Sequence, residues 1–169
     1  LGINSQNHDA SMALIDGDKI LWAAHSERYS RRKNDTMLDL DMVREMRSYG
    51  EPTKIVWFEQ PCLKNLRRLY SGQRPWIVSP RDQLRLVGLN TLPVEYVKHH
   101  ESHAAAGFYT SSFKDASVLV VDAIGEWDTV SIWNANETGL KSVWNKRYPN
   151  SMGLFYTAFT QWLGLKPNE

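Results

Sequence analysis

Three histidines within five residues are the side chains of this sequence best placed to do chemistry. His99 and His103 stand four residues apart in the run HHESHAAAGFYTSSF, residues 99–113. On a helix this spacing stacks two side chains on one face, and neutral imidazole is the commonest metal ligand in proteins. The spacing therefore predicts a helical metal-binding pair, although histidines scattered over a helix surface would give the same pattern. A complete site needs a third ligand from elsewhere in the protein.

The neighbouring residues receive other assignments. We expect His100 and Glu101 to lie on the surface of the same helix, because they point away from the face that His99 and His103 share. His25, far away in the sequence, is assigned a structural role.

Composition limits the class of protein. The chain has 169 residues, of which 42% are apolar, enough for an ordinary hydrophobic core. Its net charge of +1 gives no overall attraction to nucleic acid or to a membrane surface. The single cysteine, Cys62, excludes an intrachain disulfide and fits a reducing compartment. With no signal peptide and no long apolar run, we expect a cytoplasmic protein and no membrane partner.

The ends of the sequence predict a fragment. Leu1 opens directly within a strand-like segment, and Glu169 follows directly on an apolar helical stretch. We therefore expect this chain to be part of a longer protein.

The order of the predicted elements repeats along the chain. Three strands come first, then helices alternate with single strands, and a second set of three strands precedes a last helix. Residues 27–34, rich in arginine, are predicted to form a basic loop. The predicted strands are 1–4, 11–17, 18–27, 53–59, 94–100, 116–126, 128–136 and 139–148, and the predicted helices are 38–50, 61–72, 80–90, the segment after His99, and 152–165.

This doubled order favours an α/β fold of the actin, sugar kinase and Hsp70 superfamily (ASKHA). Proteins of that superfamily have two similar subdomains that each open with three antiparallel strands, and they hold a nucleotide between them. Residues 1–115 are predicted to form one full subdomain, and residues 116–169 the start of the second. The turns expected to hold the phosphates are residues 4–11 and 122–129, which are both polar and both carry an acidic residue.

Four motifs resemble a known family, in that family's order. The run GINSQNHDASMALIDGDKILWAAHSERYSRRK resembles the opening of the NodU-type O-carbamoyltransferases, and HHESHAAAGFYTSSF resembles their metal-binding helix. VVDAIGEWDTVSIW and SMGLFYTAFTQWLGLKPNE are similar to their second nucleotide turn and the segment after it. The resemblance covers most of the chain and is weak between residues 35 and 92.

The resemblance implies an activity. Such enzymes form carbamoyl-adenylate from carbamoyl phosphate and ATP in a C-terminal domain, which this chain lacks. Their N-terminal domain, similar to the tRNA threonylcarbamoyladenosine transferases, passes the carbamoyl group to an acceptor hydroxyl on a small molecule. A divalent metal, expected to be iron, sits at the adenylate phosphate. The chain is therefore expected to be an N-terminal fragment of an ATP-dependent carbamoyltransferase, inactive alone.

The resemblance also assigns the metal and nucleotide residues. His99 and His103 match the two helical metal ligands, and the family places the third ligand, an Asp, after residue 169. Asp122 matches the acidic residue beside the metal and the nucleotide phosphates. Gly125 belongs to the same nucleotide-binding turn.

Three residues near the start of the chain are assigned on the acceptor side. His8 is expected to act as general base for the acceptor hydroxyl, since an imidazole can take a proton near neutral pH. Asp9 is expected to orient that ring. Lys33 matches a basic residue that reaches a substrate phosphate, although a lysine in a basic loop is by default a solvated charge.

Two other functions fit the same sequence pattern. A tRNA threonylcarbamoyladenosine-type transferase would have the same domain, but RNA binding calls for a broad basic surface, and the near-neutral charge argues against it. A sugar kinase-like or Hsp70-like nucleotide-binding module would need no HxxxH pair. Metal content distinguishes such a module from both transferases.

Overall fold

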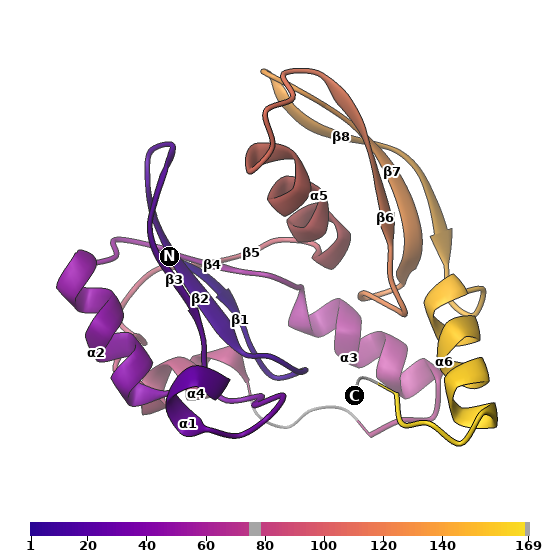
Figure 1. The fold of residues 1–169 in the computed structure, drawn as a ribbon, viewed down its shortest axis with the longest axis horizontal. Helices are drawn as coiled ribbons and strands as arrows, with labels where there is room; N and C mark the ends of the chain where they lie inside the picture. The colour runs from indigo at the N-terminus through magenta and orange to yellow at the C-terminus, as the bar shows by residue number, and fades with distance from the viewer. Residues whose placement is uncertain (75–78, 168–169) are drawn as a thin grey trace. The chain divides into compact units, whose positions relative to one another are not determined.

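The structure is a computed structural model that describes residues 1–74 and 79–167 (Figure 1). The chain divides into two compact units, and each is described by itself. The first unit comprises Leu1–Pro61 and Arg74–Val97, and the second comprises Cys62–Gln73 and Lys98–Glu169. The boundary predicted at residue 115 was based on the repeated order of strands, whereas the two units are defined by their compactness. The predicted boundary therefore stays a prediction. Residues 168 and 169, at the end of the predicted second subdomain, lie outside the described residues.

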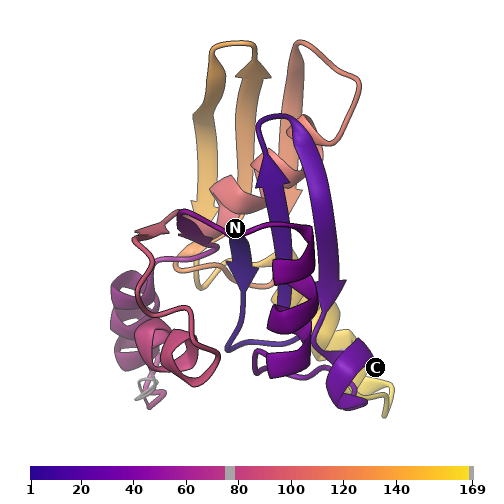
Figure 2. The same cartoon turned by 90° about the vertical axis from the view of Figure 1, so that its left-hand side faces the viewer.

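The first unit is built on a mixed five-stranded sheet in the order β3-β2-β1-β4-β5. β1, β2 and β3 pair antiparallel, whereas β4 and β5 add to β1 in parallel. Asp16 and Gly17, a dipeptide typical of hairpin turns, lie at the turn of the β2–β3 hairpin (Figure 2). The strands are β1 Gly2–Asn4, β2 Ser11–Asp16, β3 Lys19–His25, β4 Ile55–Trp57 and β5 Val94–Tyr96.

Helices α1 Glu27–Ser30, α2 Leu40–Tyr49 and α4 Pro80–Leu86 belong to the first unit. α2 lies within the predicted helix 38–50 and begins at Leu40, because the Asp39 side chain accepts hydrogen bonds from the N–H groups of Asp41 and Met42. The prediction of a loop over residues 27–34 was wrong at its start, where α1 forms one helical turn that ends at Arg31 in a left-handed conformation.

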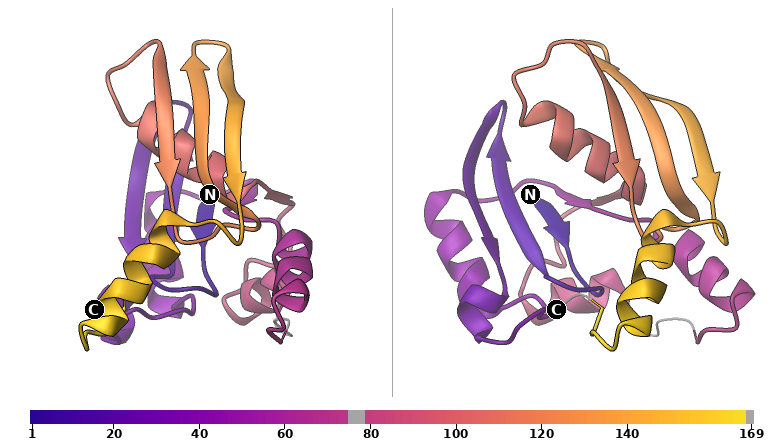
Figure 3. Two further views of the ribbon diagram at one scale, coloured as in Figure 1. Left: turned by 90° about the vertical axis from the view of Figure 1, so that its right-hand side faces the viewer. Right: turned by 45° about the vertical axis from the view of Figure 1, so that its right-hand side comes forward.

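The second unit has its own antiparallel sheet, in the order β6-β7-β8. The three strands predicted after residue 116 are thereby confirmed. Helix α5 lies on one face of this sheet, behind the strands in the left-hand view of Figure 3. The elements are α3 Pro61–Tyr70 (in this unit from Cys62), α5 His99–Tyr109, β6 Ala116–Val121, β7 Asp128–Asn136, β8 Gly139–Arg147 and α6 Met152–Trp162.

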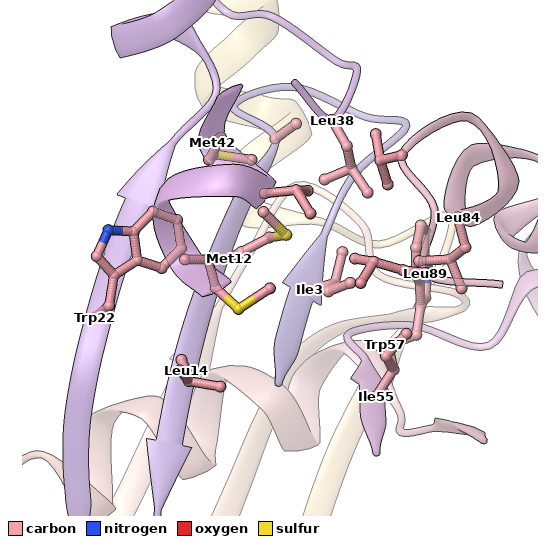
Figure 4. Packing of buried hydrophobic residues seen from close by; sticks show 14 residues of the cluster. Ile3, Met12, Leu14, Trp22, Leu38, Met42, Ile55, Trp57, Leu84 and Leu89 are labelled. Atoms are coloured by element: carbon pink, nitrogen blue, oxygen red, sulfur yellow. The ribbon is translucent and has the colours of Figure 1, made fainter. Parts of the chain in front are cut away.

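Each unit has a separate hydrophobic core. In the first unit the core lies between the sheet and its helices (Figure 4), where Met42 on α2 and Trp57 on β4 are fully buried. In the second unit Ala104 of α5 packs against Val120 of β6 and Trp133 of β7. The protein is therefore a mixed α/β protein, which agrees with the predicted fold class. Among the described residues, none of the helices combines the length and apolar character needed to cross a bilayer.

Candidate metal centre

His99 and His103 occupy the first and second turns of α5. Their Nε2 atoms lie 3.0 Å apart, and their ring centroids are 4.7 Å apart. Helical spacing thus brings the two rings together on one face, while their role as ligands stays a prediction. The segment over residues 94–100 was predicted as a single strand, but β5 ends at Tyr96 and the helix already begins at His99.

Asp122 joins the histidine pair. It follows the last residue of β6, and its Oδ2 lies 2.8 Å from Nε2 of His99 and 3.9 Å from Nε2 of His103. The three potential ligand atoms all lie within 4.8 Å of one another. The third ligand was expected after residue 169, and Asp122 was expected beside the metal. The structure provides a third candidate ligand within residues 1–169.

The Asp122 carboxyl is held in its ionised form. Burial by itself raises its pKa, but the hydrogen bond and charge of His99, together with the N–H of Ala123, outweigh burial and lower the pKa to about 2. The Ala123 N–H donates to Oδ1 of Asp122 at 2.6 Å, which leaves Oδ2 facing the histidines. An ionised carboxylate oxygen and two imidazole nitrogens form a donor set suited to a divalent transition metal.

The distances fit such a metal. Ligands about 2.0–2.2 Å from a metal lie roughly 3–3.5 Å from one another. The observed separations of 2.8, 3.0 and 3.9 Å span that range. A metal ion would satisfy all three atoms at once, whereas a single proton on Nε2 of His99 cannot point at both of its neighbours.

Gly125 lies against the first turn of α5. A Cβ atom added there would be 3.1 Å from Cβ of His99 and 3.1 Å from Cδ2 of His100, closer than ordinary packing allows. Gly125 was predicted to bind nucleotide. Its position gives it a packing role beside the histidines, and nucleotide binding stays a prediction.

Two residues that the sequence analysis did not single out hold Asp122 from the other side. The Ser151 hydroxyl donates to the carbonyl oxygen of Ala123 at 2.5 Å and accepts from the N–H of Leu154 at 3.0 Å, capping α6. A Cβ atom added at Gly153 would lie 2.5 Å from the Ala123 backbone. The sequence signal for Ser151 and Gly153 is Ser-Met-Gly before an apolar helical run. The serine is a typical helix N-cap, whereas nothing in the helix itself calls for a glycine in its first turn.

The assignment of His100 to the helix surface was wrong. Its side chain is only 1% exposed, and Nδ1 lies 2.7 Å from the Ser131 hydroxyl, which also accepts from Nε1 of Trp133. Burial lowers the pKa of His100, so the imidazole is neutral at pH 7. The available signal was that His100, Ala104 and Phe108 repeat every four residues, which defines the buried stripe of α5.

The remaining predicted residues lie in the first unit. Nδ1 of His8 is 2.8 Å from Oδ2 of Asp9, so the Asp9 carboxylate can accept a hydrogen bond from Nδ1–H, which leaves Nε2 as the basic nitrogen. The predicted pairing of this ring with Asp9 is thus present. Lys33 is largely exposed, and its Nζ lies 3.4 Å from Oε2 of Glu27.

Residues 66–169 match the family model described as carbamoyltransferase N-terminus. The chain therefore belongs to the carbamoyltransferase N-terminus family. The matched segment contains His99, His103, Asp122 and Gly125, whereas His8, Asp9 and Lys33 precede it.

Three relatives extend the comparison. An uncharacterized protein of Synechocystis is 30% identical over 200 residues, covering 100% of this chain and 32% of that protein. An uncharacterized protein of Methanocaldococcus jannaschii is 31% identical over 169 residues, covering 100% of this chain and 31% of its own. Nodulation protein NolNO of Sinorhizobium fredii is 24% identical over 177 residues, covering 95% of this chain and 26% of its own. The chain spans about a third of the length of the curated relatives it matches.

Replacement of Gly153 by alanine tests how Asp122 is held. The new Cβ would collide with the backbone of Ala123, so we expect Gly153→Ala to lower the free energy of unfolding by about 1–3 kcal/mol. Gly107, in α5, is a matched control, because a Cβ there meets nothing within 4 Å. Gly107→Ala should be neutral or stabilising by up to about 1 kcal/mol. Urea denaturation of both variants measures this, and equal stability would contradict the packing described.

The low pKa of Asp122 predicts a pH dependence of stability in the metal-free protein. A carboxyl whose pKa falls on folding, here from 3.8 to about 2, stabilises the folded state above the unfolded value. That contribution, up to about 2 kcal/mol, is lost as the pH falls from about 4 to about 2. Urea denaturation of the wild type and Asp122→Asn should differ most at neutral pH, and less at pH 3. A difference that is constant with pH would contradict the lowered pKa.

Proposed function

We propose that this chain is the N-terminal part of an ATP-dependent carbamoyltransferase. In this proposal the complete enzyme makes carbamoyl-adenylate from carbamoyl phosphate and ATP, and this part passes the carbamoyl group to an acceptor hydroxyl on a small molecule. The observation that carries the proposal is the convergence of His99, His103 and Asp122 in a chain of the carbamoyltransferase N-terminus family.

These three residues would hold a divalent metal. Two imidazoles and one carboxylate are the donor set of many non-haem iron sites, which supports iron as the resident metal. When bound, the metal would supply Lewis-acid polarisation at the phosphate of the adenylate. Asp122 is ionised and His99 lies within hydrogen-bond distance of it, so both ligands are already oriented. Gly125, in the same turn, would lie beside the nucleotide phosphates.

The residues of the first unit would act on the acceptor and on phosphate. In the proposal, Nε2 of His8 takes the proton from the acceptor hydroxyl as that oxygen attacks the carbamoyl carbon, and AMP leaves. Asp9 supports this role by accepting a hydrogen bond from Nδ1–H, with Oδ2 2.8 Å from Nδ1, which fixes the tautomer. Lys33 would contribute its charge to a substrate phosphate, and its exposure leaves it accessible to one.

We also propose that the fold is of the ASKHA type. Two observations support this: the first sheet opens with three antiparallel strands and continues with parallel crossovers, and the second unit contains another three antiparallel strands, β6, β7 and β8. In this proposal residues 1–115 form the first subdomain, and residues 116–169 begin the second.

Metal analysis and carbamoyl transfer together test the proposed function. In the full-length protein, His99→Ala and His103→Ala should each lose the metal and abolish transfer, because each removes one of three ligands. His25→Ala is the matched control, since that histidine is exposed on β3 and is assigned no role in the site. The measurements are elemental analysis and AMP release that depends on both ATP and carbamoyl phosphate.

The outcomes separate the candidate functions. Metal retained in both His99→Ala and His103→Ala would contradict the metal site. A wild-type protein without any bound divalent metal would favour a nucleotide-binding module that needs no HxxxH pair. The 169-residue chain alone should show no AMP release above background, because in this proposal the adenylate is made by the rest of the enzyme.

A further inference from the structure

The first turn of α5 has no capping side chain of its own. Its N-cap residue is Lys98, whose side chain makes no capping hydrogen bond. A lysine carries only donors and cannot accept from the N–H groups that the first turn leaves unpaired. The first residue of this uncapped turn is His99, one of the three candidate ligands.

Glu126 supplies the missing acceptor from 27 residues away. Its Oε1 and Oε2 lie 3.0 and 3.2 Å from the backbone nitrogen of His99, and the residue is only 5% exposed. A carboxylate in this position also interacts favourably with the positive end of the helix dipole. Gly125, immediately before it, allows the close approach, because a side chain there would strike the ring of His99.

We propose that Glu126 is a positioning residue for the metal centre, acting through the backbone of His99. Helix ends fray first, so a ligand on the first residue of a helix is the one most easily lost. Glu126 ties that residue to the turn that also carries Asp122. The cap and the carboxylate ligand therefore sit on one short segment, and His99 stays directed at Asp122. This inference rests on the proposed metal site.

Metal titration of cap variants tests the inference. The probe is Co²⁺, whose visible absorption reports its ligands, added to the metal-free protein. Glu126→Ala should weaken Co²⁺ binding about 10- to 100-fold, the usual effect of losing a residue that orients a ligand. Glu126→Gln keeps an oxygen acceptor but makes a weaker hydrogen bond, so a few-fold loss is expected.

A control separates positioning from general stability. Asp39→Ala removes the side-chain cap of α2 in the first unit. It should lower the free energy of unfolding and leave Co²⁺ affinity within about twofold, because additivity holds for independent sites. Amide hydrogen exchange gives a second readout: in Glu126→Ala the His99 amide should exchange faster, while the amides of Ala104 and Phe108 keep their protection.

Each result decides the matter. Wild-type protein that does not bind Co²⁺ would overturn the proposed metal site and this inference with it. If the wild type binds and Glu126→Ala binds equally well, only the inference falls. The inference also falls if Asp39→Ala weakens Co²⁺ binding as much as Glu126→Ala does. It falls too if Glu126→Gln binds Co²⁺ as weakly as Glu126→Ala, since the charge of Glu126 rather than its hydrogen bond would then be responsible. Should Glu126→Ala fail to fold, Glu126→Gln with unchanged affinity would overturn it.

Discussion

The close packing of α5 on the β6–β7–β8 sheet is the contact on which the candidate metal centre depends. Ala104 is fully buried and packs against Val120 and Trp133, so the side chain of α5 at this contact is no larger than a methyl group. A larger side chain at this point would hold the helix away from β6. His99 could not then lie 2.8 Å from the carboxylate at the end of that strand.

The end of β6 is also enclosed by two glycines. Gly125 lies against His99 and His100, and Gly153 lies against the backbone of Ala123. At both places neighbouring atoms occupy the space that a side chain would need. Asp122 is thus fixed by backbone contacts on the α6 side, while its turn is pressed against α5 on the other. Packing that is tight on both sides leaves a carboxylate little freedom, and this is what a preorganised ligand requires.

Local features of the sequence predicted much of this structure. Several features depend on residues only a few positions apart, where spacing alone decides geometry. They are the Asp39 cap of α2, the β2–β3 hairpin and the approach of His99 to His103. The pairing of His8 with Asp9 is of the same kind. The turn of helix at Glu27–Ser30 was missed because one helical turn in a basic segment has no periodic apolar signal.

What the sequence did not predict depends on tertiary packing. Residue spacing could not group Asp122 with the histidines; only the family resemblance placed it beside the metal. Its contact with His99 depends on the packing of α5 on β6. His100 was placed at the surface because it points away from the face that His99 and His103 share. The sheet covers the stripe of His100, Ala104 and Phe108, and Ser131 on β7 supplies a partner for the imidazole. Glu126 has a role for a similar reason, since its partner is a backbone N–H far away in the sequence.

Anomalous diffraction from crystals of the protein loaded with Fe²⁺ would locate the metal directly. We expect a peak at the iron absorption edge, about 2.0–2.2 Å from Nε2 of His99, Nε2 of His103 and a carboxylate oxygen of Asp122. Iron bound elsewhere, or bound by the two histidines with Asp122 turned away, would contradict it.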